Sequence, residues 1–180
     1  KKTLYSLFAL CVAKDEDEVS WYDWLWDHAL GGMDGKQLGM RIAEKAISFL
    51  SGEQIATGIY EGILTPRAMC DMLTVLSGSF LSENLYKNKT KLKDRLGTKC
   101  FSEKINIADS GLKGMGSFPF DGEGVPSVET ALVRNGYFES FLYDAYYGRK
   151  FGKGSTGNGV RAGIKDPPIC APRGFFIDAA

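Results

Sequence analysis

The chain has 180 residues and no formal net charge, because 22 lysines and arginines balance 22 aspartates and glutamates. Hydrophobic residues make up 44% and charged residues 24%, as in ordinary soluble globular proteins. The balance argues against a dedicated nucleic-acid-binding protein, which normally carries a basic excess. No apolar run approaches the roughly 20 residues that span a bilayer, so we expect no membrane segment.

The histidine and cysteine content excludes several kinds of site. His28 is the single histidine, so no site with two histidine ligands can form within this chain. The cysteines lie far apart and form no C-x-x-C pair of the kind found in zinc ribbons and thioredoxin-type centres. They are Cys11, Cys70, Cys100 and Cys170. We interpret them as reduced thiols and expect a cytoplasmic protein.

The N-terminal part of the chain predicts a β-hairpin. Residues 3–13 and 18–30 are rich in aromatic and β-branched side chains, and an acidic cluster at 15–18 separates them. His28 continues one face of the second strand, together with Tyr22, Trp24 and Trp26. We therefore interpret His28 as a packing or hydrogen-bonding residue rather than a catalytic one.

Helical patterns follow, with a short β-prone segment between them. Asp34 can cap a helix that runs to about Leu50, on which apolar residues recur at spacings of three and four. The segment 54–60 predicts a strand. Thr65-Pro66 is a favourable helix start and predicts a second amphipathic helix ending near Leu81.

The rest of the chain indicates further hairpins and ordered loops. Asn135-Gly136 predicts a two-residue hairpin turn, because both turn positions need positive φ. In the segment 87–95 every basic residue stands at an odd position, so an extended conformation would place these charges on one face. We favour a solvated edge over an anion-binding stripe there. The mixture of antiparallel hairpins, helices and glycine-rich loops predicts an α+β fold.

Two loop motifs admit a chemical interpretation, and in both we favour a structural one. Residues 152–157 fit G-x-G-x-x-G, but the sequence predicts neither the strand before it nor the helix after it that a dinucleotide site requires. Asp121 and Glu123 could bind a cation or act as acid and base. Asp-Gly turns, however, commonly use the carboxylate to bond their own backbone.

Three blocks together resemble the TldD/PmbA family, described as modulators of DNA gyrase and as metalloproteases. The blocks are Gly114–Val125, Arg134–Tyr137 and Ser155–Gly159. The resemblance implies the family's C-terminal domain type over residues 1–180. Because the chain starts without methionine inside an apolar run, and family members are about twice as long or more, we expect a piece of a longer chain.

In TldD-like members a helix carries the zinc motif H-E-x-x-x-H, whereas PmbA-like members, also called TldE, lack it. By order and apolar pattern, that helix corresponds to Pro66–Asp71. Pro66 and Asp71 then stand in place of the histidines, and Arg67 in place of the glutamate. The resemblance is therefore to the PmbA-like kind, and it implies no metal or cofactor in this chain, with zinc only in a TldD-like partner.

The resemblance also implies a role for the glycine-rich loops. They form part of a chamber wall at which an unfolded peptide can add as a strand, with Ser155, Thr156, Gly157 and Asn158 as peptide-binding residues. We expect a non-catalytic subunit that assembles with itself or with a TldD-like homologue.

Two alternatives to a non-catalytic subunit remain. One is a hydrolase that uses other residues, for which Cys70, Asp71, Asp121 and Glu123 are the candidates. The other is a nucleic-acid-binding or gyrase-associated protein, suggested by the basic residues in 87–95 and by the family's gyrase-modulator description.

Overall fold

A computed structural model describes residues 3–50 and 52–179. The chain forms two compact units, one up to Glu61 and one from Gly62 onward, and each is described by itself. Both combine helices with antiparallel strands, which confirms the α+β fold class. The expectation of a single domain over 1–180 stays a prediction. Within the described part of the chain, no helix has the length and apolar character needed to cross a bilayer.

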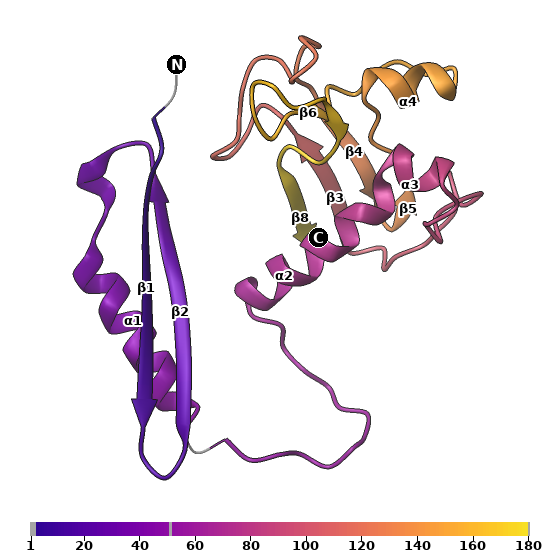
Figure 1. The fold of residues 1–180 in the computed structure, drawn as a ribbon. Helices are drawn as coiled ribbons and strands as arrows, with labels where there is room; N and C mark the ends of the chain where they lie inside the picture. The colour runs from indigo at the N-terminus through magenta and orange to yellow at the C-terminus, as the bar shows by residue number, and fades with distance from the viewer. Residues whose placement is uncertain (1–2, 51, 180) are drawn as a thin grey trace. The chain divides into compact units, whose positions relative to one another are not determined.

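The first unit is a long hairpin with a helix lying along one of its faces. Strands β1 (Tyr5–Lys14) and β2 (Glu18–Asp27) pair antiparallel around the acidic turn, as the sequence predicts. Helix α1 (Gly35–Ser48) packs against both strands (Figure 1). The Asp34 side chain caps this helix by accepting a hydrogen bond from the Gln37 N–H at 2.9 Å. A short 3₁₀ turn, η1 (Leu30–Gly32), connects the two parts.

The other face of the hairpin is exposed and apolar. Side chains alternate between the two faces along each strand, and large apolar residues of both strands lie on the exposed face. This set comprises Phe8, Leu10, Val12, Tyr22, Trp24 and Trp26. At its end, Nδ1 of His28 lies 2.7 Å from the Thr3 carbonyl oxygen, in agreement with the hydrogen-bonding interpretation of this histidine.

The predicted strand at 54–60 is wrong. This segment has no regular secondary structure, and Ile55 and Ile59 are exposed. A β-prone sequence forms a strand only when another strand supplies hydrogen-bond partners, and none of the described strands pairs with this segment.

The second unit begins with the helices α2 (Pro66–Ser77) and α3 (Ser82–Tyr86), joined by the 3₁₀ turn η2 (Gly78–Phe80). The Thr65 hydroxyl accepts a hydrogen bond from the Ala68 N–H, and Pro66 occupies the first helical position, as predicted. The α-helix ends at Ser77 rather than near Leu81, because the chain tightens there into the 3₁₀ turn.

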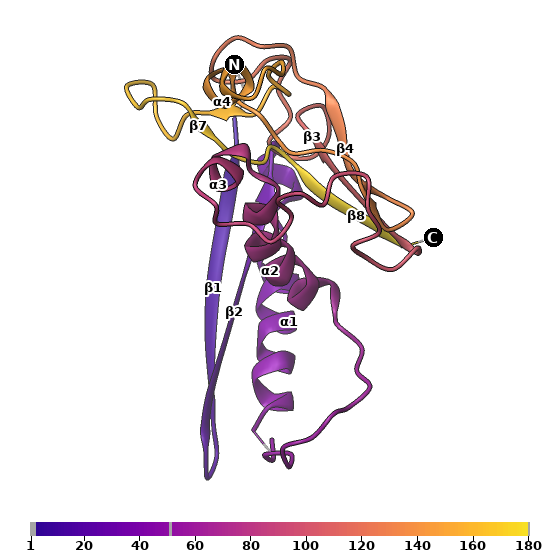
Figure 2. The same ribbon diagram turned by 90° about the vertical axis from the view of Figure 1, so that its right-hand side faces the viewer.

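An antiparallel sheet of order β5-β4-β3-β8 carries the core of this unit, and Figure 2 shows its strands β4, β3 and β8. Its strands are β3 (Ile105–Ser110), β4 (Glu129–Arg134), β5 (Tyr137–Phe138) and β8 (Phe175–Ala179). Asn135 (φ 49°) and Gly136 (φ 78°) form the predicted turn between β4 and β5. The rings of Phe80 and Phe138 pack edge to face at 5.7 Å between centroids, so η2 closes over the sheet's apolar side.

Segment 87–95 is not extended, so its basic residues do not share one strand face; they are exposed, as solvated charges are. The chain turns repeatedly here, and Asn88 and Asp94 adopt positive φ. The Thr90 hydroxyl donates to the Ser79 carbonyl at 2.7 Å and anchors the turns to η2. The alternating pattern therefore reflects no strand geometry.

The remaining elements are short. They are α4 (Ala145–Lys150), β6 (Gly159–Val160) and β7 (Ile169–Cys170), of which β6 and β7 pair antiparallel. The G-x-G-x-x-G segment therefore follows a helix and precedes a strand, the reverse of the order that a dinucleotide fingerprint requires.

Candidate functional site

The first two turns of α2 carry Pro66, Arg67 and Asp71. Arg67 Nε lies 4.0 Å from Asp71 Oδ2, and the Asp71 side chain is largely exposed. Pro66 offers no ligand atom and Arg67 is a permanent cation, so these side chains do not fit a zinc ion. No cluster of three or more histidine, cysteine or acidic side chains suited to a metal occurs among residues 3–50 and 52–179.

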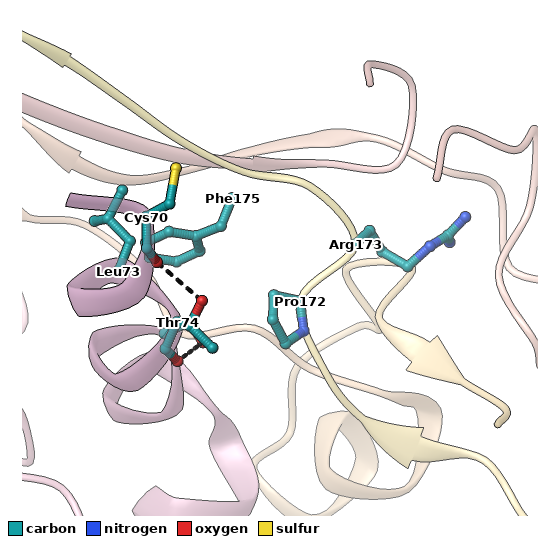
Figure 3. A pocket seen from close by; sticks show the side chains of 7 residues that line it. Cys70, Leu73, Thr74, Pro172, Arg173 and Phe175 are labelled. Carbon is teal, nitrogen blue, oxygen red and sulfur yellow. Dashed lines mark hydrogen bonds between the residues drawn. The ribbon is translucent and has the colours of Figure 1, made fainter. Parts of the chain in front are cut away.

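A cavity of about 290 Å³ adjoins the next turns of α2 (Figure 3). It is lined by Cys70, Leu73, Thr74, Ser77, Pro172, Arg173 and Phe175. The Thr74 hydroxyl donates to the Cys70 carbonyl at 2.9 Å, and the Ser77 hydroxyl donates to the Thr74 carbonyl at 2.8 Å. These hydroxyls are engaged with the helix backbone, and no histidine lines the cavity, so nothing here activates a nucleophile.

Cys170, unlike the exposed Cys70, lies in the interior of this unit. Its thiol is buried and donates to the Leu142 carbonyl at 3.2 Å. Burial raises the pKa of the Cys170 thiol, and a neutral thiol is a poor nucleophile and metal ligand.

A buried polar network joins three separate parts of the second unit. Asp109 on β3 accepts hydrogen bonds from the backbone N–H groups of Arg173 (2.8 Å) and Gly174 (3.1 Å). Its other oxygen accepts from the Asn158 amide at 2.7 Å. Burial raises the pKa of Asp109, and the bond from Asn158 offsets part of this rise. The network fixes the loop at 155–158 against the sheet.

Within that loop, the polar side chains of Ser155, Thr156 and Asn158 bond inside the chain. The Ser155 and Thr156 hydroxyls each lie 3.1 Å from the Tyr143 carbonyl. Asn158 also donates to the Ala171 carbonyl at 3.0 Å. Gly157 has φ +73°, and a Cβ there would lie 2.9 Å from the Pro126 carbonyl oxygen. These contacts assign the side chains a structural task, and the peptide-binding role of this loop stays a prediction.

The carboxylates of Asp121 and Glu123 bond to backbone groups, and the bonds of Asp121 within its own turn are those that the turn interpretation predicts. Asp121 accepts from the N–H groups of Glu123, Val125 and Gly159, each at 2.9 Å. Glu123 accepts from the Ala145 N–H at 2.7 Å at the start of α4. Cys70 and Asp121 line different cavities, so the residues proposed for an alternative hydrolase are not all brought together.

A larger cavity, of about 550 Å³, lies among the loops of the second unit. Phe118, Phe120, Ile164, Arg161 and Arg173 supply its apolar and cationic lining. Sequence reasoning missed this group, because its members are spread over more than fifty residues and no local motif connects them. The one available signal was the aromatic pair in Phe118-Pro119-Phe120.

A family model and several relatives match this chain. Residues 57–180 match the model of the PmbA/TldA metallopeptidase C-terminal domain. An uncharacterized protein of Methanocaldococcus jannaschii is 34% identical, over 80% of this chain and 35% of the relative. The metalloprotease PmbA of Escherichia coli is 26% identical, over 87% of this chain and 36% of the relative.

A solved structure shares this fold at similar coverage. A Thermotoga maritima protein described as a proposed modulator of a DNA gyrase superposes with a TM-score of 0.82 and 32% identity, over 90% of this chain and 38% of its own. The chain therefore spans between a third and two fifths of the length of these relatives.

Proposed function

This chain belongs to the PmbA/TldD metallopeptidase family, and we propose that it is a non-catalytic, PmbA-like subunit of such a peptidase system. In this role it helps to form a chamber that accommodates unfolded peptides, and it assembles with itself or with a TldD-like homologue in the cytoplasm. Zinc then resides in the homologue and not in this chain.

The observation that carries the proposal is the chemistry of α2. By the correspondence that the family resemblance implies, Pro66, Arg67 and Asp71 take the places of two histidines and a glutamate, and the chain's single histidine, His28, lies outside this helix. Proline cannot ligate zinc, and a guanidinium can neither ligate it nor accept a proton from a bound water. Asp71 supplies the one carboxylate of the three, and its side chain is largely exposed, 4.0 Å from Arg67 Nε.

The alternative functions receive less support. The acid–base pair required by a hydrolase is occupied by backbone hydrogen bonds at Asp121 and Glu123. A nucleic-acid role is suggested by the gyrase description of the Thermotoga maritima protein. The balanced charge and the turned conformation of 87–95 do not favour it.

A complementation assay tests the proposal. Reduced and carboxymethylated α-lactalbumin serves as the unfolded substrate, incubated with this chain, with a zinc-bearing TldD-like homologue, or with both. We expect no cleavage by this chain alone and more cleavage by the mixture than by the homologue alone. Zinc-dependent cleavage by this chain alone would disprove the non-catalytic role, and an unchanged rate in the mixture would disprove the subunit role.

A further inference from the structure

We infer that the 550 Å³ cavity binds a segment of a peptide in which a carboxylate lies beside a large apolar side chain. This inference rests on the proposed function, because it names the class of peptide that the subunit accommodates. Phe118, Phe120 and Ile164 form the apolar part of the site, and Arg161 and Arg173 form the cationic part.

The apolar part is open to a ligand. The rings of Phe118 and Phe120 pack edge to face with centroids 4.9 Å apart, so each holds the other in position. They are nevertheless 39% and 49% exposed, and Ile164 is 99% exposed. Covering this surface with an aromatic or aliphatic side chain removes apolar area from water, which favours binding.

Both guanidinium groups are held by neutral acceptors. Arg161 donates from Nε to the Gly122 carbonyl at 2.7 Å and from Nη1 to the Asp166 carbonyl at 2.5 Å. Arg173 donates from Nη1 to the Gly157 carbonyl at 3.1 Å and the Ser127 hydroxyl at 3.4 Å, and more weakly from Nη2 to the Phe120 carbonyl at 3.5 Å.

Carbonyl and hydroxyl acceptors position a guanidinium without neutralising its charge. Within the described ranges, neither Arg161 nor Arg173 forms an ion pair with a carboxylate. Figure 3 shows the Arg173 guanidinium pointing away from Cys70 and Thr74, so its charge does not face the smaller cavity. It reaches instead toward the carbonyl of Phe120, a residue of the larger one.

Two acidic groups near the cavity, Asp121 and Asp109, have backbone hydrogen-bond partners. Asp121 lines the cavity, but both of its oxygens accept hydrogen bonds from backbone N–H groups. Asp109 is buried and hydrogen-bonds the backbone N–H of Arg173, and the Arg173 charge offsets part of the rise that burial causes in the pKa of Asp109, without forming an ion pair with it. Guanidinium groups that lack a carboxylate ion pair among the described residues and lie beside exposed rings therefore complement a carboxylate next to an apolar side chain.

The carboxylate could belong to an acidic side chain or to a peptide C-terminus, and three labelled peptides distinguish these sources. They are Gly-Ser-Gly-Leu-Phe-Glu with an amidated end, the same peptide with glutamine in place of glutamate, and Gly-Ser-Gly-Leu-Phe with a free carboxylate. Binding to the 180-residue chain is followed by fluorescence anisotropy. We expect one or both carboxylate peptides to bind about fivefold more tightly than the glutamine peptide at low salt.

Variants link any preference to this cavity. Arg161→Gln should remove most of the preference for carboxylate, and Ile164→Ser should weaken all three peptides. Arg149→Gln serves as the matched control, because Arg149 is an exposed arginine on α4 outside the cavity, and it should change nothing. Thermal unfolding of each variant checks that it is folded. Arg173→Lys is a second change at the cationic part of the site, and it retains the positive charge but loses the planar guanidinium group.

Three results would overturn the inference. Equal affinity for all three peptides would do so while leaving the proposed subunit role intact, because that role is tested by complementation. An unchanged preference in Arg161→Gln would place the binding elsewhere. Binding of a labelled eight-residue oligothymidylate as tight as that of the best peptide would assign the arginines and aromatic rings to single-stranded nucleic acid instead.

Discussion

The side-chain amide of Asn158 donates a 2.7 Å hydrogen bond to the carboxylate of Asp109, and both residues are almost completely buried, at 1% and 2% exposure. Asn158 belongs to the glycine-rich loop and Asp109 to the central strand β3. The bond therefore holds a loop that lacks regular structure against the sheet.

Removing this bond should destabilise the protein. Asn158→Ala leaves a buried carboxylate without one of its partners, which typically costs about 2–3 kcal/mol of unfolding free energy. Urea denaturation of the 180-residue chain, followed at the unfolding of the second unit, measures the loss of unfolding free energy. Lys153→Ala, an exposed change in the same segment, is the control and should alter stability by less than about 0.5 kcal/mol. Equal effects of the two changes would show that the bond contributes little.

Asp109 should make stability depend on pH in a defined direction. Burial raises its pKa in the folded state above the usual 3.8, so the folded protein binds this proton more tightly than the unfolded chain. Stability from this group is then greatest below pH 3.8 and falls as the pH rises to the folded-state pKa.

The variant Asp109→Asn isolates that contribution. The unfolding free energy of the native protein minus that of the variant should decrease as the pH rises above 3.8, because other titrating groups cancel in the difference. Denaturation at a series of pH values from acid to neutral provides the measurement. A difference that increases with pH would mean that the carboxylate is stabilised in its charged form.

Gly157 should tolerate no side chain. Its φ of +73° is unfavourable for other residues, and a Cβ would lie 2.9 Å from a backbone oxygen. Gly157→Ala should therefore lower the unfolding free energy by about 1–3 kcal/mol. Gly154→Ala is a matched control in the same loop, because a Cβ there meets no atom within 4 Å. Comparable losses in both variants would contradict the role of Gly157.

Asp121 should behave as a structural residue. Asp121→Ala deprives three backbone N–H groups of their acceptor and should cost about 2–4 kcal/mol of stability. Asp71→Ala removes an exposed carboxylate whose ion pair is weak, and should cost less than about 1 kcal/mol. Retention of full stability by Asp121→Ala, together with loss of any hydrolytic turnover, would support the hydrolase alternative.

The sequence predicts helix starts and hairpin turns, because these depend on residues that are close together in the chain. Asp34 and Thr65-Pro66 mark helix starts because capping depends on residues within one turn. Asn135-Gly136 marks its hairpin because those residue types accept positive φ. The strand expected at 54–60 failed because a strand requires a partner that the segment's own composition does not specify.

The candidate sites likewise have features that the sequence predicts and features that only the fold reveals. The absence of a second histidine and the residues Pro66 and Arg67 can be read directly from the sequence, and they argue against zinc chemistry. The position of Arg161, Arg173 and Phe118 around one cavity cannot be read in this way, because the fold brings together residues that share no local pattern. The partners of Asn158 were hidden for the same reason, since Asp109 lies 49 positions away.

The most direct test of the proposed function is the zinc content of the purified protein. Elemental analysis is performed on this chain alone and on its complex with a co-expressed TldD-like homologue, with Asp71→Ala as a further sample. The account predicts no stoichiometric zinc in the chain alone, zinc in the complex in proportion to the homologue, and no change in Asp71→Ala. One tightly bound zinc ion per chain in the protein by itself would contradict it.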